Sequence, residues 1–271
     1  MRWWLAAVAL AGTMRATVPH DLVAQSDRSQ LPDLIERLQL TPAGAPLWLE
    51  RLGAGLGVRH QVERQLLLSR EGDTLLAVTG RERHVPERPD VNLLLSRKGA
   101  DIVLVHNHPR STGLPAKDLL QLVRPGLAAI AAIGHDGSVY VAAAGPRYGG
   151  HQFGGQYQVA CGEVDRRLAF YLASPMDAPS KSAIPAVLTH VVASALARAS
   201  VIEYRAYLAP ARQRALAGLA DHVGRAIAAA ADVVAAEPVQ PRQDRGGLGL
   251  CGSDNSAFSQ LLANAQSRVT V

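Results

Sequence analysis

The stretch 101-DIVLVHNHP-109 places four apolar residues between an aspartate and a pair of histidines. A short apolar run bounded by polar residues is typical of a buried β-strand. Side chains two positions apart on a strand point to the same face, so His106 and His108 would lie side by side. We therefore predict a buried strand that presents two imidazoles at its end.

The segments on both sides of this strand predict an α/β fold. Residues 62–80 contain two apolar runs around a polar turn and predict a β-hairpin. Residues 127–144 predict a second pair of strands, and 91–99 predicts a short helix. Pro115 fits the first position of another helix, which continues with helical spacing over 118–123. Strands with interposed helices predict a mixed sheet flanked by helices.

The composition changes along the chain and predicts five parts. They are an N-terminal helix or signal segment (1–24), a helical lead-in (25–57), an α/β domain (58–145), an alanine-rich helical region (146–236) and a loosely ordered tail (237–271). Within the helical region, 148-YGGHQFGG-155 is expected to act as a flexible joint. The stretch 200-SVIEYRAY-207 interrupts the alanine-rich pattern of the helices predicted over 184–236, and we expect it to pack against the α/β domain.

Bulk properties set limits on the class of protein. A chain of 271 residues with 48% hydrophobic and 19% charged residues should fold into one or two domains and is not disordered as a whole. The net charge of +5 comes from scattered arginines, which indicates a mildly basic surface and leaves nucleic acid open as a partner. The two cysteines, Cys161 and Cys251, imply neither a disulfide framework nor a cysteine-rich zinc module.

The N-terminus leaves the cellular location open. Residues 1–16 carry one early arginine and a short apolar run, which resembles a minimal secretory signal. We expect a cytoplasmic protein, and a cleaved signal would instead make it periplasmic or secreted. No other segment approaches the roughly 20 apolar residues that a membrane span needs.

The two histidines have the residue types around them that a catalytic zinc site requires. Asp118, in the first turn of the following helix, can add an oxygen ligand and leave one position open. Zinc lowers the pKa of its bound water from 15.7 to about 7, and a general base then takes the proton. Glu63 is the base that we predict, because it opens the first strand of the same sheet. Glu71 in the predicted turn and Glu82 in a polar loop are the alternatives.

Together these residues resemble a known family, the JAMM/MPN metallopeptidase domain, especially its bacterial JAB and RadC-like branches. The resemblance covers about residues 58–145 and rests on Glu63, on 106-HNHP-109 after an apolar strand and on Asp118. It implies an MPN-like mixed sheet with cytidine-deaminase-like layering and a zinc-dependent hydrolase that acts on peptide or protein isopeptide bonds. It also implies that His106, His108 and Asp118 bind Zn²⁺ and that Glu63 acts as the base.

One position departs from the family's pattern. The residue three before Asp118 is Pro115, where the family has a serine that steadies the tetrahedral oxyanion, and the loop is one residue shorter than usual. Loss of an oxyanion donor can cost roughly 100- to 1,000-fold in rate. Ser111 or Thr112 could supply a hydroxyl instead, and Ser111 is the donor that we predict.

Other interpretations remain open at this stage. The two imidazoles could be satisfied by backbone groups, and Asp118 could simply stabilise a helix N-terminus through the helix dipole. The chain could be an MPN-like scaffold without turnover. A RadC-like protein associated with DNA would instead show salt-sensitive binding to DNA.

Overall fold

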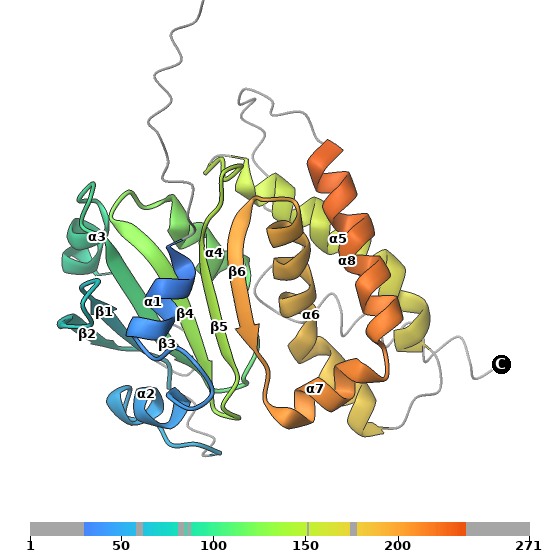
Figure 1. Ribbon diagram of the computed structural model, residues 1–271, viewed down its shortest axis with the longest axis horizontal. Helices are drawn as coiled ribbons and strands as arrows, with labels where there is room; N and C mark the ends of the chain where they lie inside the picture. The colour runs from blue at the N-terminus through green and yellow to red at the C-terminus, as the bar shows by residue number, and fades with distance from the viewer. Residues whose placement is uncertain are drawn as a thin grey trace, which may run out of the picture.

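The computed structural model describes residues 30–57, 62–80, 85, 88–150, 152–173 and 178–236. These residues form one six-stranded sheet with helices on both faces (Figure 1). Its strands are β1 (Arg64–Leu68), β2 (Thr74–Thr79), β3 (Ile102–His108), β4 (Leu127–Gly134), β5 (Val139–Ala144) and β6 (Ile202–Tyr207). They lie in the order β2-β1-β3-β4-β5-β6, and only β3 and β4 are parallel neighbours. The predicted α/β fold with a mixed sheet flanked by helices is confirmed.

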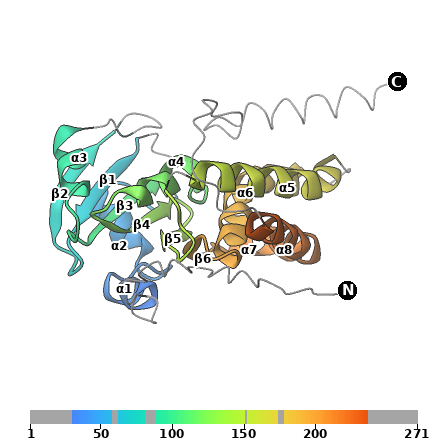
Figure 2. The same ribbon diagram turned by 90° about the horizontal axis from the view of Figure 1, so that it is seen from above.

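Two helical layers enclose the sheet (Figure 2). The first layer consists of α1 (Leu31–Arg37) and α2 (Ala45–Arg51). The second layer contains α3 (Pro89–Leu95), α5 (Phe153–Ala173), α6 (Ala178–Arg198) and α8 (Ala220–Ala236), with α7 (Pro210–Ala217) between β6 and α8. Each layer closes its own hydrophobic core against one face of the sheet.

The central strand β3 is buried along its whole length, as expected for a strand that is covered on both faces. Val103 and Val105 pack in the core under the first layer, whereas Leu104 packs in the core under the second. The same alternation of side chains places His106 and His108 on the face of the second layer.

A crossover joins the parallel strands β3 and β4 and carries the third predicted ligand. Residues 109–115 leave the end of β3, and α4 (Ala116–Leu119) and the 3₁₀ helix η1 (Leu120–Val123) lead toward β4. Parallel neighbours need a long connection of this kind, because the chain must return to the same end of the sheet. Asp118 is thereby carried back over the end of β3.

The C-terminal region is not purely helical. The stretch 200–207 contains β6, which pairs antiparallel with β5 at the edge of the sheet. A strand therefore interrupts the helices predicted over 184–236, and the expected packing of this stretch against the α/β domain is confirmed. Ile202 and Tyr204 are buried while Arg205 is exposed, and this short alternation is what a half-buried edge strand requires. The region therefore completes the sheet of the α/β domain.

Other predicted elements agree with the structure, with one correction. The hairpin over 62–80 and the strand pair over 127–144 are present. The predicted joint 148–155 is partly helical, because α5 already begins at Phe153. The N-terminal segment (1–24), Glu82 and the tail (237–271) lie outside the described residues. Within the part of the chain that is described, no helix combines the length and apolarity needed to cross a membrane.

Gly126 is expected to be a sensitive position in this fold. A Cβ atom there would lie 2.6 Å from the carbonyl oxygen of Arg97 and 2.9 Å from that of Leu95. Gly126→Ala should therefore lower the free energy of unfolding by about 1–3 kcal/mol, as overpacking does. Gly162→Ala on α5, where a Cβ meets nothing, should raise it by about 0.5–1 kcal/mol. Urea denaturation measures both, and equal stability of the two variants would contradict this packing.

Candidate metal centre

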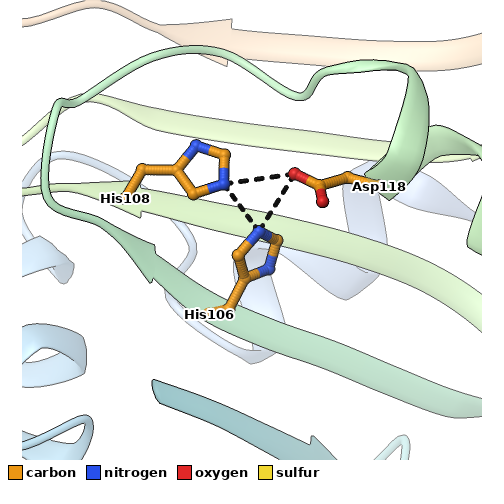
Figure 3. Close-up of side chains that lie close together, drawn as sticks. All are labelled: His106, His108 and Asp118. Atoms are coloured by element: carbon orange, nitrogen blue, oxygen red, sulfur yellow. Dashed lines mark hydrogen bonds and ion pairs between the residues drawn. The ribbon is translucent and has the colours of Figure 1, made fainter. Parts of the chain in front are cut away.

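Three side chains converge on the face of the second layer (Figure 3). His106 Nε2 lies 2.8 Å from His108 Nε2 and 3.2 Å from Asp118 Oδ2. His108 Nε2 lies 3.1 Å from the same carboxylate oxygen. Both histidines are only 4% exposed. The structure therefore brings together the three residues that the sequence predicts as metal ligands.

Local backbone geometry explains this convergence. The two imidazoles stand on one face because β3 remains extended through His108. Pro115 is extended, with φ −75° and ψ 174°, and immediately precedes α4. Asp118 lies in the first turn of α4, so its short side chain reaches the ends of both rings.

The loop after β3 fixes the orientation of His108. Its Nδ1 lies 2.8 Å from the Thr112 carbonyl oxygen, and a carbonyl can only accept, so Nδ1 carries the proton. Ser111 has φ of 53°, which turns the chain sharply at this point. In neutral His108 the lone pair is thus on Nε2, which faces the other two ligand atoms. Such a hydrogen bond to the far ring nitrogen is typical of metal-binding histidines.

The electrostatics of the cluster favour a cation. Burial alone would raise the pKa of Asp118, but the charges and hydrogen bonds of His106 and His108 outweigh it and hold that pKa far below its usual value. Burial also acts to lower the pKa of His108, yet Asp118 raises it above the ordinary histidine value. A buried carboxylate next to two imidazoles attracts positive charge, which a proton or a metal ion can supply.

The geometry of the cluster fits a divalent metal ion. Ligands about 2.0–2.1 Å from a tetrahedral zinc ion are separated by roughly 3.3 Å. The three separations here, 2.8 to 3.2 Å, are a few tenths of an ångström shorter. Two imidazole nitrogens and one carboxylate oxygen form the donor set of open, catalytic zinc sites. The same donor set also binds iron(II) in proteins, so these residues fit a divalent transition-metal ion, zinc among them.

Glu63 lies beside this cluster. It directly precedes β1, in which Gln65 pairs with His106 of β3. The pairing of β1 with β3 ends at this pair, and Glu63 lies two residues before it along the chain. The Glu63 side chain is 13% exposed, and its Oε2 lies 4.0 Å from Lys117 Nζ. Its negative charge contributes to the raised pKa of His108.

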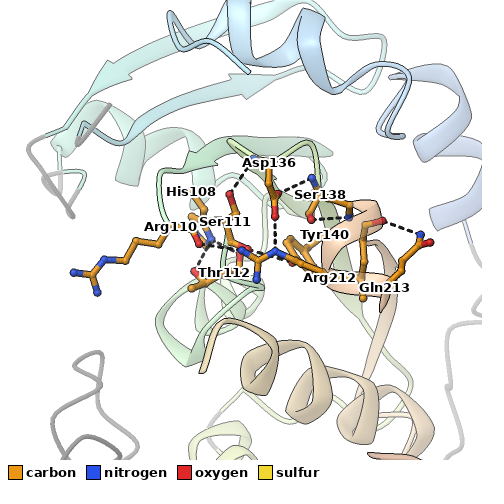
Figure 4. A network of polar contacts seen from close by, with 11 residues as sticks. His108, Arg110, Ser111, Thr112, Asp136, Ser138, Tyr140, Arg212 and Gln213 are labelled. Carbon is orange, nitrogen blue, oxygen red and sulfur yellow. Dashed lines mark hydrogen bonds and ion pairs between the residues drawn. The ribbon is translucent and has the colours of Figure 1, made fainter. Parts of the chain in front are cut away.

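The hydroxyls of the loop make other contacts (Figure 4). Ser111 Oγ accepts a hydrogen bond from the Asp136 N–H at 3.0 Å, so it faces the turn between β4 and β5. Thr112 Oγ1 lies 3.3 Å from His108 Nδ1. Pro115 has no hydroxyl to offer at the start of α4. The predicted role of Ser111 as oxyanion donor therefore stays a prediction.

No family model, curated protein or solved structure matches this chain. The interpretation of the centre therefore depends on its own geometry and on the chemistry of its ligand atoms. The likeness to the JAMM/MPN domain remains a likeness of motif residues.

Arg212 is a residue that sequence reasoning did not find. It lies on α7, and its Nη2 donates to the Arg110 carbonyl at 3.2 Å, while its Nε pairs with Asp136 (Figure 4). It thus connects α7 to the loop after β3 and to the β4–β5 turn. No local pattern predicts such a contact between residues about a hundred positions apart.

Buried polar groups around the centre were also missed. Asn107 is fully buried, His135 in the turn between β4 and β5 is 3% exposed, and the two side chains are hydrogen bonded. Burial raises the pKa of Tyr157 on α5, and the negative charge of Asp118 raises it further.

Proposed function

We propose that this chain is a zinc-dependent metallopeptidase or isopeptidase of the JAMM/MPN type, with MPN-like layering of its sheet and helices. The observation that carries the proposal is the convergence of His106 Nε2, His108 Nε2 and Asp118 Oδ2 within hydrogen-bonding distance of one another. Two nitrogens and one oxygen leave a tetrahedral ion one open position, where chemistry can take place.

Each residue has a defined task in this proposal. His106, His108 and Asp118 hold the ion, and Thr112 keeps His108 in the tautomer that can bind it. Zinc in such a site activates water and polarises the carbonyl group that is attacked. Glu63 takes the proton and passes it to the leaving amine. Its place beside the cluster, with Oε2 4.0 Å from Nζ of Lys117, the residue before Asp118, supports this role.

The substrate class follows from this chemistry. A base that can return its proton suits the cleavage of an amide, because an amine leaves well only after protonation. We therefore propose peptide bonds or lysine isopeptide bonds in proteins as the substrates.

A chelation experiment tests the proposal. The zinc-loaded protein is incubated with a peptide library and with lysine-linked isopeptides, and products are identified by mass spectrometry. Cleavage should cease on treatment with 1,10-phenanthroline and return with about one equivalent of zinc. Absence of any transition metal in the purified protein, measured by inductively coupled plasma mass spectrometry, would overturn it.

A scaffold that binds metal without turnover is the second candidate. It is favoured by Pro115, which occupies the position of the family's serine at the start of α4. For the peptidase we expect Pro115→Ser to change the rate of cleavage by less than about tenfold, because another group already stabilises the oxyanion. A scaffold, whose wild type shows no cleavage, should instead acquire cleavage about 100-fold or more above the background of the assay, the size of one such donor. Zinc content, measured in parallel, should be the same in both proteins.

A further inference from the structure

Asn107 lies between the two histidines in the chain, but its side chain is on the opposite face of the sheet. It is 0% exposed. Its Oδ1 accepts a hydrogen bond from the Arg64 N–H at 2.7 Å. Its Nδ2 lies 3.1 Å from the Val62 carbonyl oxygen and 2.9 Å from His135 Nε2.

These partners determine which way the amide points. The Arg64 N–H can only donate and the Val62 carbonyl can only accept. Exchanging the oxygen and nitrogen of the amide would therefore place its NH₂ group against the Arg64 N–H and its oxygen against the Val62 carbonyl oxygen. With the amide as described, both of its N–H groups have an acceptor, at Val62 and at His135. The side chain is therefore held in a single orientation.

The two backbone partners of Asn107 are the residues on either side of Glu63. The paired register between β1 and β3 extends from Leu68↔Val103 to Gln65↔His106. Just beyond that point, the Asn107 amide bonds the peptide groups of Val62 and Arg64. The amide thus fixes the backbone on both sides of Glu63 to the strand that carries the histidines.

We propose that Asn107 is a positioning residue that holds Glu63 next to His108. The inference rests on the proposed function, in which Glu63 is the base. Strand β3 then serves both faces of the sheet: its two histidines bind the ion on one face, and Asn107 aligns the base from the other. His135 completes the arrangement by accepting the second N–H of the amide.

If Asn107 only stabilised the fold, the effect of replacing it would not depend on Glu63. Strand β1 is already paired with β2 on one side and with β3 on the other, so the strand does not depend on this one side chain. Ser138 provides a matched control, because it is also fully buried and its Oγ accepts the Ala209 N–H at 2.9 Å. Ser138 connects β5 to the segment after β6 and does not contact residues 62–64 in any described hydrogen bond.

A double-mutant cycle of Asn107→Ala and Glu63→Gln tests the proposal. The first readout is the spectral pH, defined as the pH at which the visible spectrum of the Co²⁺-loaded protein changes. A carboxylate beside the ion shifts this pH. The second is the rate of cleavage of the best peptide from the library. Ser138→Ala is measured in parallel, and Asn107→Asp, which keeps an acceptor for Arg64, replaces the alanine variant if that variant does not fold.

The proposal predicts a dependence of one residue on the other. Asn107→Ala should still bind Co²⁺, shift the spectral pH and slow cleavage by about 10- to 100-fold, the usual effect of a group that orients metal-site residues. In the Glu63→Gln background the same change should alter the rate by less than about twofold. Ser138→Ala should leave the spectral pH unchanged.

Two other outcomes overturn the inference. One is an Asn107 variant that keeps the spectral pH of the wild type. The other is an Asn107→Ala change that slows cleavage by the same factor in the Glu63→Gln background as in the wild type. A wild type that binds Co²⁺ but cleaves no probe contradicts the proposed function instead, and the spectral cycle then tests the position of Glu63 by itself.

Discussion

Replacing His108 with alanine should abolish zinc binding. The wild type is expected to carry about one zinc per chain, because three ligand atoms already converge at the centre. Without His108 only His106 and Asp118 remain, and two protein ligands do not make a zinc site of this type. Inductively coupled plasma mass spectrometry after dialysis against metal-free buffer measures the difference.

Thermal unfolding gives an independent measurement of the same loss. A ligand present at 100 times its dissociation constant stabilises the folded state by about 2.7 kcal/mol. For a chain of this size each kcal/mol corresponds to roughly 2–4 °C, so zinc should raise the wild-type Tm by roughly 5–11 °C. It should leave the Tm of His108→Ala unchanged.

His190→Ala is the matched control for this prediction. His190 is a partly buried histidine on α6, and its Nδ1 lies 3.1 Å from the Tyr204 hydroxyl, outside the ligand cluster. This variant should lose some stability and keep its zinc. Equal zinc content in the His108 and His190 variants would show that the metal is held elsewhere.

Replacing Glu63 with glutamine should separate metal binding from turnover. The variant should retain its zinc, because Glu63 is not among the three converging ligands. Its rate of cleavage should fall by about 100- to 10,000-fold, the usual contribution of a general base. Glutamine keeps the size and polarity of the side chain but cannot accept a proton at neutral pH.

Glu71→Gln is the control, since Glu71 lies exposed in the turn between β1 and β2. It should retain both zinc and turnover. If Glu63→Gln cleaves as fast as the wild type, another group must be the base. If it loses its zinc, Glu63 contributes to binding the ion and its role must be revised.

Local patterns in the sequence predicted much of the centre. The alternation of side chains along 102–108 was sufficient to place His106 and His108 on one face, because it depends only on extended backbone. The helix after Pro115 was sufficient to place Asp118 in a first turn. The contacts among these three side chains agree with that prediction.

Local patterns failed where a short segment could adopt more than one structure. Residues 202–207 lie between alanine-rich helices, and six residues are too few for their alternation to outweigh that context. The available edge of β5 determined their structure as a strand. Helix α5 likewise includes glycines that were expected to form a joint, because packing can override weak helix propensity.

The sequence by itself therefore determined the α/β class and the two histidines and aspartate that converge. Only the tertiary structure decided that Glu63 lies beside the cluster, that the Asn107 amide bonds the peptide groups of Val62 and Arg64, and that Arg212 reaches the loop from α7. The physical reason is that periodicity is a property of consecutive residues. The register between distant strands and the hydrogen bonds of buried side chains form only when the whole chain has closed around its core.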